Sequence, residues 1–351
     1  MVRWTAYPYL GGTMLHSGID LHKNDLVIST LDAGGTQVQK LRLRTQRSVV
    51  SRYFRLLPGP HRAVVESTAS WYWLADLLER EGVELTLAHA KLVKAIAYAK
   101  VKTDAVDAHT LAQLLRVDLI PPAHMISPEL RGIRDVLRVR LRLVQKRTRC
   151  QSAIASLLTK YNVASPEDLP VLARLEAECH HQQITLLERQ IKRVVKAISP
   201  ELLTLDPVQH LLWIPGIGRI NAFSIYLEID DITRFPSVKH FLSYARLVPG
   251  SSNSGGKTKH RPSKDGNRYL KIAFTHAAVR AIQNSPEIKA FYQKQCRRKP
   301  KPVARGIVAK ELGKIVYYVR KHAAPYDGTF KGKPLSTSKK AEWPRKRSPD
   351  A

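Results

Sequence analysis

Four acidic residues in the first third of the chain have positions that suit metal-assisted phosphoryl transfer. Asp20 lies inside a short apolar segment that is typical of a strand, and strand interiors ordinarily avoid aspartate. Glu66 ends another apolar run, and Asp104 and Asp107 are three residues apart, so on a helix they share one face. Clustered carboxylates repel one another and therefore favour hard divalent cations. Two Mg²⁺ ions bound there could activate an attacking oxygen and stabilise a leaving one.

Most of these carboxylates also have a purely structural explanation. The helix dipole favours Asp104 and Asp107 in a first turn, with Thr103 as N-cap, and for that pair alone this explanation is preferred. Glu66 could be a capping or turn residue before the next helix. Asp20 has no such explanation, and the four residues together are more specific than any one of them.

Two other segments indicate contact with phosphate. Residues 131–149 contain eight basic residues and one acid, and they lie in a proline-free stretch predicted to be one long helix. We expect Arg138 and Arg142 of this helix to contact nucleic acid, although a solvated amphipathic helix is the ordinary alternative. Residues 214–218, IPGIG, lie between two apolar helical stretches, as in a helix-hairpin-helix. The backbone N–H groups of Gly216 and Gly218 could hold a phosphate there, or the segment could simply be a tight turn.

Hydrophobic patterning predicts the elements that position these residues. Residues 16–45 read as a three-stranded antiparallel meander, followed by a strand at 62–66, a helix at 70–81, a strand at 83–88 and a helix at 103–115. This order predicts a mixed α/β sheet covered by helices. Prolines at 121, 122 and 128 mark a boundary, after which two long helices, 130–161 and about 170–198, could form a hairpin or pair with a partner chain.

The remaining segments are predicted from their composition. Residues 250–271 contain six basic residues and four serines, and we expect a polar loop, which inside a folded domain is usually functional or disordered. Packing helices are predicted at 272–280 and 302–320, and a basic disordered tail from 329 onwards.

Overall composition indicates a folded protein with a polyanionic partner. The chain has 351 residues, a net charge of +29 and 44% apolar residues, which fits two or three domains. Its three cysteines are too widely spaced for a disulfide framework or a CxxC metal site, which fits a reducing cytoplasm. No signal peptide or membrane span is predicted, and Met14, directly before the first patterned segment, is the expected natural start.

Five motifs in a fixed order resemble one known family. They are GIDLHK (18–23), VVEST (64–68), KTDAVDAHTLAQLL (102–115), IPGIG (214–218) and SSNSGGKTKHRPSKDGNRYLK (251–271). In this order, over about residues 15–322, they resemble the IS110 and IS1111 insertion-sequence transposases, which are relatives of the Piv invertase.

The resemblance implies a domain organisation. It predicts a RuvC-like, ribonuclease-H-like domain over residues 15–122, a coiled-coil helical region over 123–205, a mainly helical transposase domain over 206–325 and a basic tail over 326–351. The first domain would carry a DEDD tetrad formed by Asp20, Glu66, Asp104 and Asp107. The third would carry the helix-hairpin-helix and a catalytic serine.

The resemblance also implies a mechanism. Ser254, with Ser251 and Ser252 as nearby alternatives, would attack a DNA phosphate and form a covalent phosphoserine link, aided by Mg²⁺ on the tetrad. The basic residues expected to hold the scissile phosphodiester are Lys257, Lys259, Arg261, Lys264 and Arg268.

The implied partners are nucleic acids and further copies of the chain. They are donor and target DNA, a structured noncoding guide RNA called the bridge RNA, and a dimer that assembles into a tetramer, in which one subunit's serine completes another's carboxylate site. The implied location is the prokaryotic cytoplasm, at the nucleoid.

Two alternatives remain from the sequence. A metal-dependent RuvC-like junction resolvase, nuclease or protein-only DNA invertase would keep the first domain but not the serine chemistry or the guide RNA. A non-catalytic nucleic-acid-binding protein would keep only the charge and the fold, although the presence of all four carboxylates and the serine argues against it.

Overall fold

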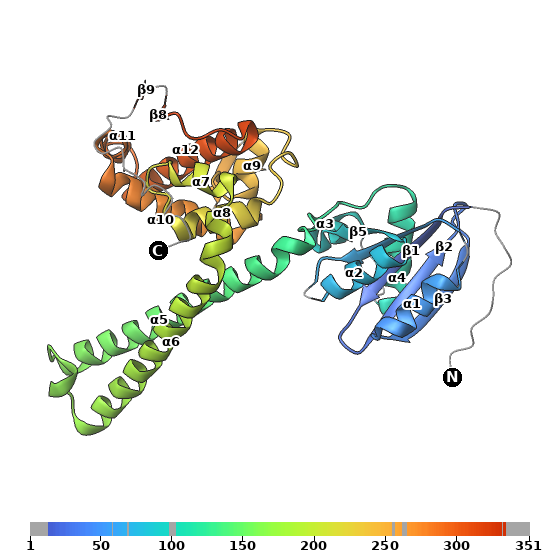
Figure 1. The fold of residues 1–351 in the computed structure, drawn as a ribbon, viewed down its shortest axis with the longest axis horizontal. Coiled ribbons are helices and arrows are strands. Elements are labelled where there is room, and N and C mark those ends of the chain that lie inside the picture. Colours follow the sequence, from blue (N-terminus) through green and yellow to red (C-terminus); the bar gives the residue numbers. More distant parts are fainter. Residues whose placement is uncertain are drawn as a thin grey trace, which may run out of the picture. The chain divides into compact units, whose positions relative to one another are not determined.

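The structure is a computed structural model that describes residues 13–57, 59–68, 70–97, 103–254, 257–261, 265–331 and 333–334. The chain divides into two compact units, residues 1–125 and 126–351 (Figure 1). In the described part of the chain, no helix combines the length and the apolar character that a membrane crossing requires.

The first unit is built on a five-stranded mixed sheet with the order β3-β2-β1-β4-β5. The strands are β1 (Leu15–Leu21), β2 (Asp25–Leu31), β3 (Gln37–Arg44), β4 (His61–Glu66) and β5 (Glu84–Ala88). The first three form an antiparallel meander, whereas β4 runs parallel to β1 and β5 parallel to β4. The predicted meander and the mixed α/β sheet are therefore confirmed.

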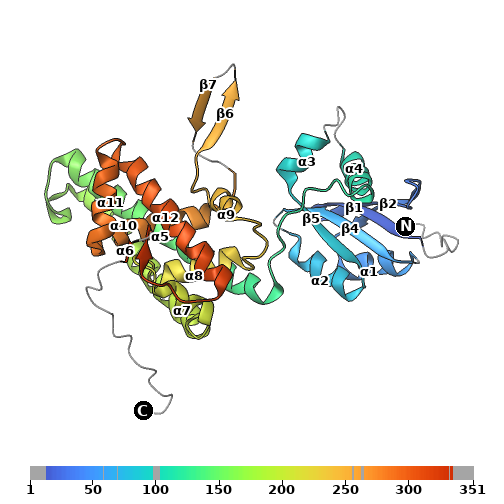
Figure 2. The ribbon, with the colours of Figure 1, turned by 90° about the horizontal axis from the view of Figure 1, so that it is seen from above.

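Helices cover both faces of this sheet (Figure 2). α1 (Arg47–Arg55) and α2 (Tyr72–Arg80) lie on one face, and α3 (Ala90–Ile96) and α4 (Asp104–Arg116) on the other. α4 packs closely on β1 because Gly18 has no side chain. A Cβ at Gly18 would lie 2.0 Å from the carbonyl oxygen of Ala108 and 2.5 Å from the amide nitrogen of Ala112. Glycine at this position therefore sets how near α4 can come to the strand.

The face of the sheet toward α1 holds a buried polar network. The Ser17 hydroxyl lies 2.5 Å from Thr30 Oγ1 and 2.6 Å from His61 Nε2, and Thr30 Oγ1 lies 2.7 Å from the Tyr53 hydroxyl. Burial, and to a lesser extent the nearby His16, lowers the pKa of His61 to about 4. This network therefore consists of neutral groups at neutral pH.

The second unit begins with two long helices, α5 (Pro128–Tyr161) and α6 (Val171–Leu203), joined by a short 3₁₀ turn at Pro166–Asp168. They fold back on each other as a helical hairpin (Figure 1). Leu157 of α5 packs with Ala173 and Ala177 of α6, and the Cys150 thiol donates to Gln183. The hairpin that the sequence allowed is therefore formed within one chain.

A helical body completes the second unit. It consists of α7 (Asp206–Leu212), α8 (Arg219–Ile229), α9 (Val238–Tyr244), α10 (Arg268–Asn284), α11 (Pro286–Cys296) and α12 (Lys301–His322). Its core includes Phe223, Phe241, Phe274 and Tyr317. Gly216, in the turn before α8, has φ +82°, and a Cβ there would lie 2.2 Å from the carbonyl oxygen of Ala277. The turn therefore packs directly on the backbone of α10.

The serine-rich segment at residues 250–271 differs from the sequence prediction. The segment predicted as a polar loop contains β6 (Gly250–Ser254) and β7 (Lys257–Arg261), which pair antiparallel (Figure 2). Its Gly-Gly pair is a hairpin signal that outweighs the polar composition. α10 then begins at Arg268, where the Asn267 side chain accepts bonds from the amides of Tyr269 and Leu270.

The prediction of a disordered tail from residue 329 onwards is wrong for the first residues of that segment. β8 (Thr329–Phe330) pairs with β9 (Lys333–Pro334), and Phe330 is buried with its ring centroid 5.5 Å from that of Phe291. A single aromatic side chain therefore extends the folded body beyond residue 326. Residues 335–351, which make up most of the predicted tail, lie outside the described residues.

Candidate active site

The sheet brings Asp20 and Glu66 to the same edge. β1 and β4 are parallel, with Ile19 paired to Val65, and each acidic residue directly follows its paired residue. Side chains alternate along a strand, so Asp20 lies on the same face as Gly18, toward α4. Glu66 shares its face with Val64, which packs against Leu111 and Leu115 of α4. The strands therefore direct both carboxylates to the α4 face.

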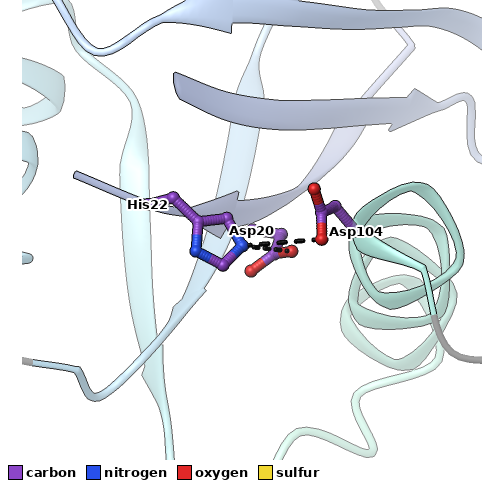
Figure 3. Close-up of side chains that lie close together, drawn as sticks. All are labelled: Asp20, His22 and Asp104. Carbon is purple, nitrogen blue, oxygen red and sulfur yellow. Dashed lines mark hydrogen bonds and ion pairs between the residues drawn. The ribbon is translucent and has the colours of Figure 1, made fainter. Parts of the chain in front are cut away.

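α4 begins at this edge and supplies the other two carboxylates. Asp104 is its first residue and Asp107 lies in its first turn, and the Thr103 side chain caps the helix by accepting from the Val106 amide at 3.3 Å. Figure 3 shows the Asp104 carboxylate close to Asp20. The predicted helix start and its N-cap are therefore confirmed, and they hold Asp104 beside the strand.

A histidine completes the closest group of ligand atoms. Asp20, His22 and Asp104 each offer one atom, and these atoms all lie within 4.8 Å of one another. His22 Nε2 is 3.2 Å from Asp20 Oδ2 and 3.6 Å from Asp104 Oδ1 (Figure 3). Among the described residues, Glu66 and Asp107 are not members of this group, although they lie at the same edge and in the same helical turn. The structure thus brings two of the four predicted carboxylates, Asp20 and Asp104, into one group of ligand atoms.

The two aspartates are in different electrostatic environments. Burial raises the pKa of Asp20, the charges of Asp104 and Asp107 raise it further, and His22 opposes the shift. The pKa of Asp104 is lowered, chiefly because Arg42 donates a hydrogen bond to its Oδ2 at 2.5 Å. A divalent cation stabilises a half-buried carboxylate that lies beside other negative charges, because its positive charge offsets the burial and the repulsion. The donor set, two carboxylates and an imidazole, fits such an ion.

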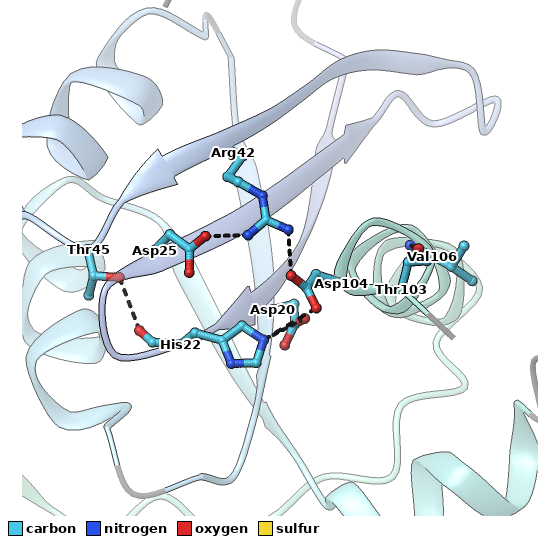
Figure 4. A network of polar contacts seen from close by, with 8 residues as sticks. All are labelled: Asp20, His22, Asp25, Arg42, Thr45, Thr103, Asp104 and Val106. Carbon is cyan, nitrogen blue, oxygen red and sulfur yellow. Dashed lines mark hydrogen bonds and ion pairs between the residues drawn. The ribbon is translucent and has the colours of Figure 1, made fainter. Parts of the chain in front are cut away.

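Arg42 belongs to a polar network that the sequence analysis missed (Figure 4). Its guanidinium binds both Asp104 and Asp25. Asp20 pairs with Val27, and Val27 pairs with Arg42, so Asp20 and Arg42 lie in one row across three strands. The register of the meander is the signal that would have found Arg42. His22 had a simpler signal, because it lies two residues after Asp20 and so on the same side of the chain.

Arg138, predicted to contact nucleic acid, is occupied within the second unit. Its Nε and Nη2 donate to the two carboxylate oxygens of Glu228, both at 2.7 Å, and its guanidinium lies 4.4 Å from the ring centroid of Tyr269. Glu228 is buried, so Arg138 neutralises a charge inside the protein. Arg142, farther along α5, is exposed.

The glycines of the IPGIG turn differ in their surroundings. Gly216 packs on α10, which explains the need for glycine without a ligand. Gly218 precedes α8 as its N-cap residue, and a Cβ there would meet nothing within 4 Å. Phosphate contact at either glycine stays a prediction.

The serine segment is described only in part. Ser251, Ser252 and Ser254 belong to β6, and Lys257, Lys259 and Arg261 belong to β7, but their side chains lie outside the described part of the structure, as does all of Lys264. Arg268 is exposed at the start of α10. The roles predicted for these residues stay predictions.

A sheet edge that gathers carboxylates around a possible cation site, in a strongly basic chain, indicates an enzyme that cleaves nucleic acid strands. Residues 17–163 match a family described as transposase, of the DEDD IS110 type, and residues 208–293 match the transposase IS116/IS110/IS902 family. The chain therefore belongs to the IS110 family of transposases, which cleave DNA and transfer its strands.

Individual relatives agree with this assignment. The transposase of insertion sequence element IS1328 from Yersinia enterocolitica is 25% identical over 325 residues, which cover 86% of this chain and 95% of the relative. The transposase of IS1111A from Coxiella burnetii is 26% identical over 222 residues, 55% of this chain and 59% of the relative. A pilin gene-inverting protein from Moraxella bovis is 31% identical over 150 residues, 41% of this chain and 45% of the relative.

Proposed function

We propose that this transposase cleaves and rejoins donor and target DNA through a covalent phosphoserine intermediate, within a ribonuclease-H-like first domain and a serine-bearing second unit. The observation that carries the proposal is the convergence of Asp20, on a strand, with Asp104, at a helix start, at one edge of the sheet. In this proposal Asp20, Glu66, Asp104 and Asp107 hold Mg²⁺, two ions per site. Bound Mg²⁺ would stabilise negative charge on the attacking and leaving oxygens.

The side chains around the carboxylates have supporting tasks in this proposal. Arg42 keeps Asp104 ionised and fixes one of its two oxygens. Burial of Asp20 beside two other acids makes its carboxylate a ready partner for a cation. Glu66 and Asp107 complete the tetrad from the neighbouring strand and from the same helical turn.

The proposed nucleophile is Ser254. Its Oγ forms a bond to the DNA phosphorus, the bond from phosphorus to the 3′ oxygen breaks, and the proton of the serine hydroxyl ends on the released 3′ oxygen. Support comes from the antiparallel hairpin, whose backbone register pairs Ser254 with Lys257 and Ser252 with Lys259. Lysine and arginine beside a nucleophile neutralise the charge of a phosphodiester in the transition state.

The proposed assembly is a dimer that forms a tetramer through a coiled coil of α5 and α6, with the serine of one subunit serving the carboxylates of another. Val171 and Leu172, the first two residues of α6, are 79% and 81% exposed. Exposed apolar side chains next to each other favour contact with another copy. The net charge of +29 suits the proposed partners, which are DNA and a structured guide RNA.

The covalent step is tested by trapping the protein on DNA. Wild-type protein, incubated with DNA that carries the ends of its element and with the element's RNA, should form an adduct that survives denaturing electrophoresis. Ser254→Ala should form none, whereas Ser251→Ala and Ser252→Ala serve as matched controls and should still form it. If Ser254→Ala gives as much adduct as wild type, the serine assignment is wrong. Asp20→Asn should stop cleavage whether the enzyme is a serine recombinase or a metal-dependent nuclease.

RNA guidance is tested separately. The protein is purified from cells that carry its complete element, and the RNA that survives a high-salt wash is sequenced. One discrete RNA from the flanking noncoding DNA supports guidance. Heterogeneous RNA that is lost as salt rises indicates nonspecific phosphate binding.

One observation favours a second candidate function, a protein-only DNA invertase. The pilin gene-inverting proteins of Moraxella bovis and Moraxella lacunata are each 31% identical to this chain over 150 residues. Inversion of DNA by the purified protein in the absence of RNA would support this alternative and contradict guidance.

A further inference from the structure

His22 lies among the carboxylates of the proposed cation site, and we propose that it is itself a ligand of the ion, through Nε2. The inference rests on the proposed role of Asp20 and Asp104 in holding a divalent cation. It adds a nitrogen to a set of oxygen ligands. The preference of the site for Mn²⁺ over Mg²⁺ would then be greater than that of a site made of four carboxylates alone.

The distances suit ligation. His22 Nε2 lies 3.2 Å from Asp20 Oδ2 and 3.6 Å from Asp104 Oδ1, and the ring points toward both carboxylates (Figure 3). Adjacent ligands of an octahedral ion with bonds of about 2.1 Å are separated by about 3 Å. The nitrogen therefore already lies at nearly the spacing of a shared ligand from each of the two oxygens.

The backbone of His22 is held in place. Its N–H donates to the carbonyl oxygen of Asp25 at 3.0 Å, and the Thr45 hydroxyl donates to its carbonyl oxygen, also at 3.0 Å (Figure 4). These bonds fix the tight connection between β1 and β2. The imidazole therefore starts from a fixed point directly after the strand that carries Asp20.

The orientation of Asp104 supports the same site. Arg42 binds its Oδ2 and is itself bound to Asp25, whereas Asp104 Oδ1 faces His22 (Figure 4). One oxygen is thus held by a positioning residue and the other remains directed at the cluster. Such outer contacts commonly orient metal ligands.

The chemistry of imidazole explains the selectivity. Mg²⁺ prefers oxygen ligands, whereas Mn²⁺ binds imidazole more readily and lies above Mg²⁺ in affinity for nitrogen-containing sites. The alternative is that His22 only donates a hydrogen bond to Asp20, and then no nitrogen would bind the ion.

The test uses the full-length protein and Mn²⁺ as the probe. Mn²⁺ is titrated by electron paramagnetic resonance, and pulsed measurements on protein with ¹⁵N-labelled histidine detect a bound nitrogen. We expect coupling to one histidine nitrogen in the wild type. His22→Ala should lose this coupling and bind Mn²⁺ at least about tenfold more weakly, with a smaller change for Mg²⁺. His89→Ala, which changes an exposed histidine of the same unit, should behave as wild type.

The outcomes separate the inference from the proposed function. If Asp20→Asn binds Mn²⁺ as well as wild type does, the proposed cation site itself is wrong. If Asp20→Asn loses Mn²⁺ while the wild type shows no nitrogen coupling and His22→Ala keeps its affinity, the cation site stands and the ligand role of His22 is overturned. Circular dichroism of each variant confirms that the fold is intact.

Discussion

Both units hold an arginine against a carboxylate, but the two pairs lie in opposite surroundings. In the second unit Arg138 meets Glu228 through two bonds of 2.7 Å, and their side chains are 24% and 3% exposed. In the first unit Arg42 meets Asp104, and their side chains are 55% and 36% exposed. An exposed pair exchanges easily with water, whereas breaking a buried pair leaves a charge without compensation. The buried pair therefore serves the fold, and the exposed pair leaves its carboxylate open to a ligand.

The neighbours of each pair reinforce this difference. Glu228 also accepts a bond from Asn267, the N-cap of α10, and Arg138 stacks on Tyr269 in the first turn of that helix. The buried pair thus ties α5, α8 and α10 together. The exposed pair, through the second contact of Arg42 with Asp25, connects β3 to β2 and to the start of α4.

The largest effect is expected from breaking the buried pair. Glu228→Ala removes the acceptor of a largely buried guanidinium and should lower the free energy of unfolding by about 3 kcal/mol, measured by urea denaturation. Glu188→Ala breaks an exposed pair with Arg147 between the two long helices and serves as the matched control. Similar losses in both variants would show that burial does not distinguish the two kinds of pair.

A second prediction tests whether the interior of the first unit excludes charge. The pKa of His61 is lowered from 6.5 to about 4, so the unfolded chain takes up a proton before the folded one does. The stability that this histidine contributes is complete above pH 6.5 and is lost as the pH falls to about 4, by about 3 kcal/mol. The free energy of unfolding is measured against pH for the wild type and for His61→Gln. Parallel curves would contradict the prediction.

A third change tests a backbone contact of the carboxylate site that involves no charge. Gly18→Ala would place a methyl group 2.0 Å from a backbone oxygen of α4, so the helix must shift away from β1. We expect a loss of about 1–3 kcal/mol in unfolding free energy, together with weaker Mn²⁺ binding, because Asp104 moves with the helix. Gly132→Ala on α5, where a Cβ meets nothing within 4 Å, should leave Mn²⁺ binding unchanged and raise the unfolding free energy by about 0.5–1 kcal/mol, because alanine favours a helix over glycine. Unchanged Mn²⁺ binding in Gly18→Ala would show that α4 need not lie so close.

The smallest effect on stability is expected from the exposed pair. Arg42→Ala should leave the melting temperature close to that of the wild type, because exposed ion pairs contribute little. The pKa of Asp104 should rise toward its ordinary value, since Arg42 is the main cause of its lowering. Carbon NMR of the titrating carboxylates measures this change. A marked fall in melting temperature would place this pair in the same class as Arg138 and Glu228.

Much of the first unit could be predicted because its signals are local. Alternating apolar residues predicted the strands, and Thr103 followed by acidic residues predicted the start of α4. The hairpin at 250–261 was missed because its polar composition obscured the Gly-Gly signal. The end of the folded body was misplaced because the burial of Phe330 depends on Phe291, 39 positions earlier in the sequence.

The sequence by itself determined the types of elements, the strongly basic character of the chain and the four acidic residues that could bind a cation. Tertiary structure decided which charged side chains lie close to one another. The row that joins Asp20 to Arg42 depends on strand register, and the pair of Arg138 with Glu228 joins residues 90 positions apart. Periodicity reveals which face of an element is buried, but the register between elements is set by packing across the fold. The surroundings of Asp104 and Glu228, open in one unit and buried in the other, follow from that packing.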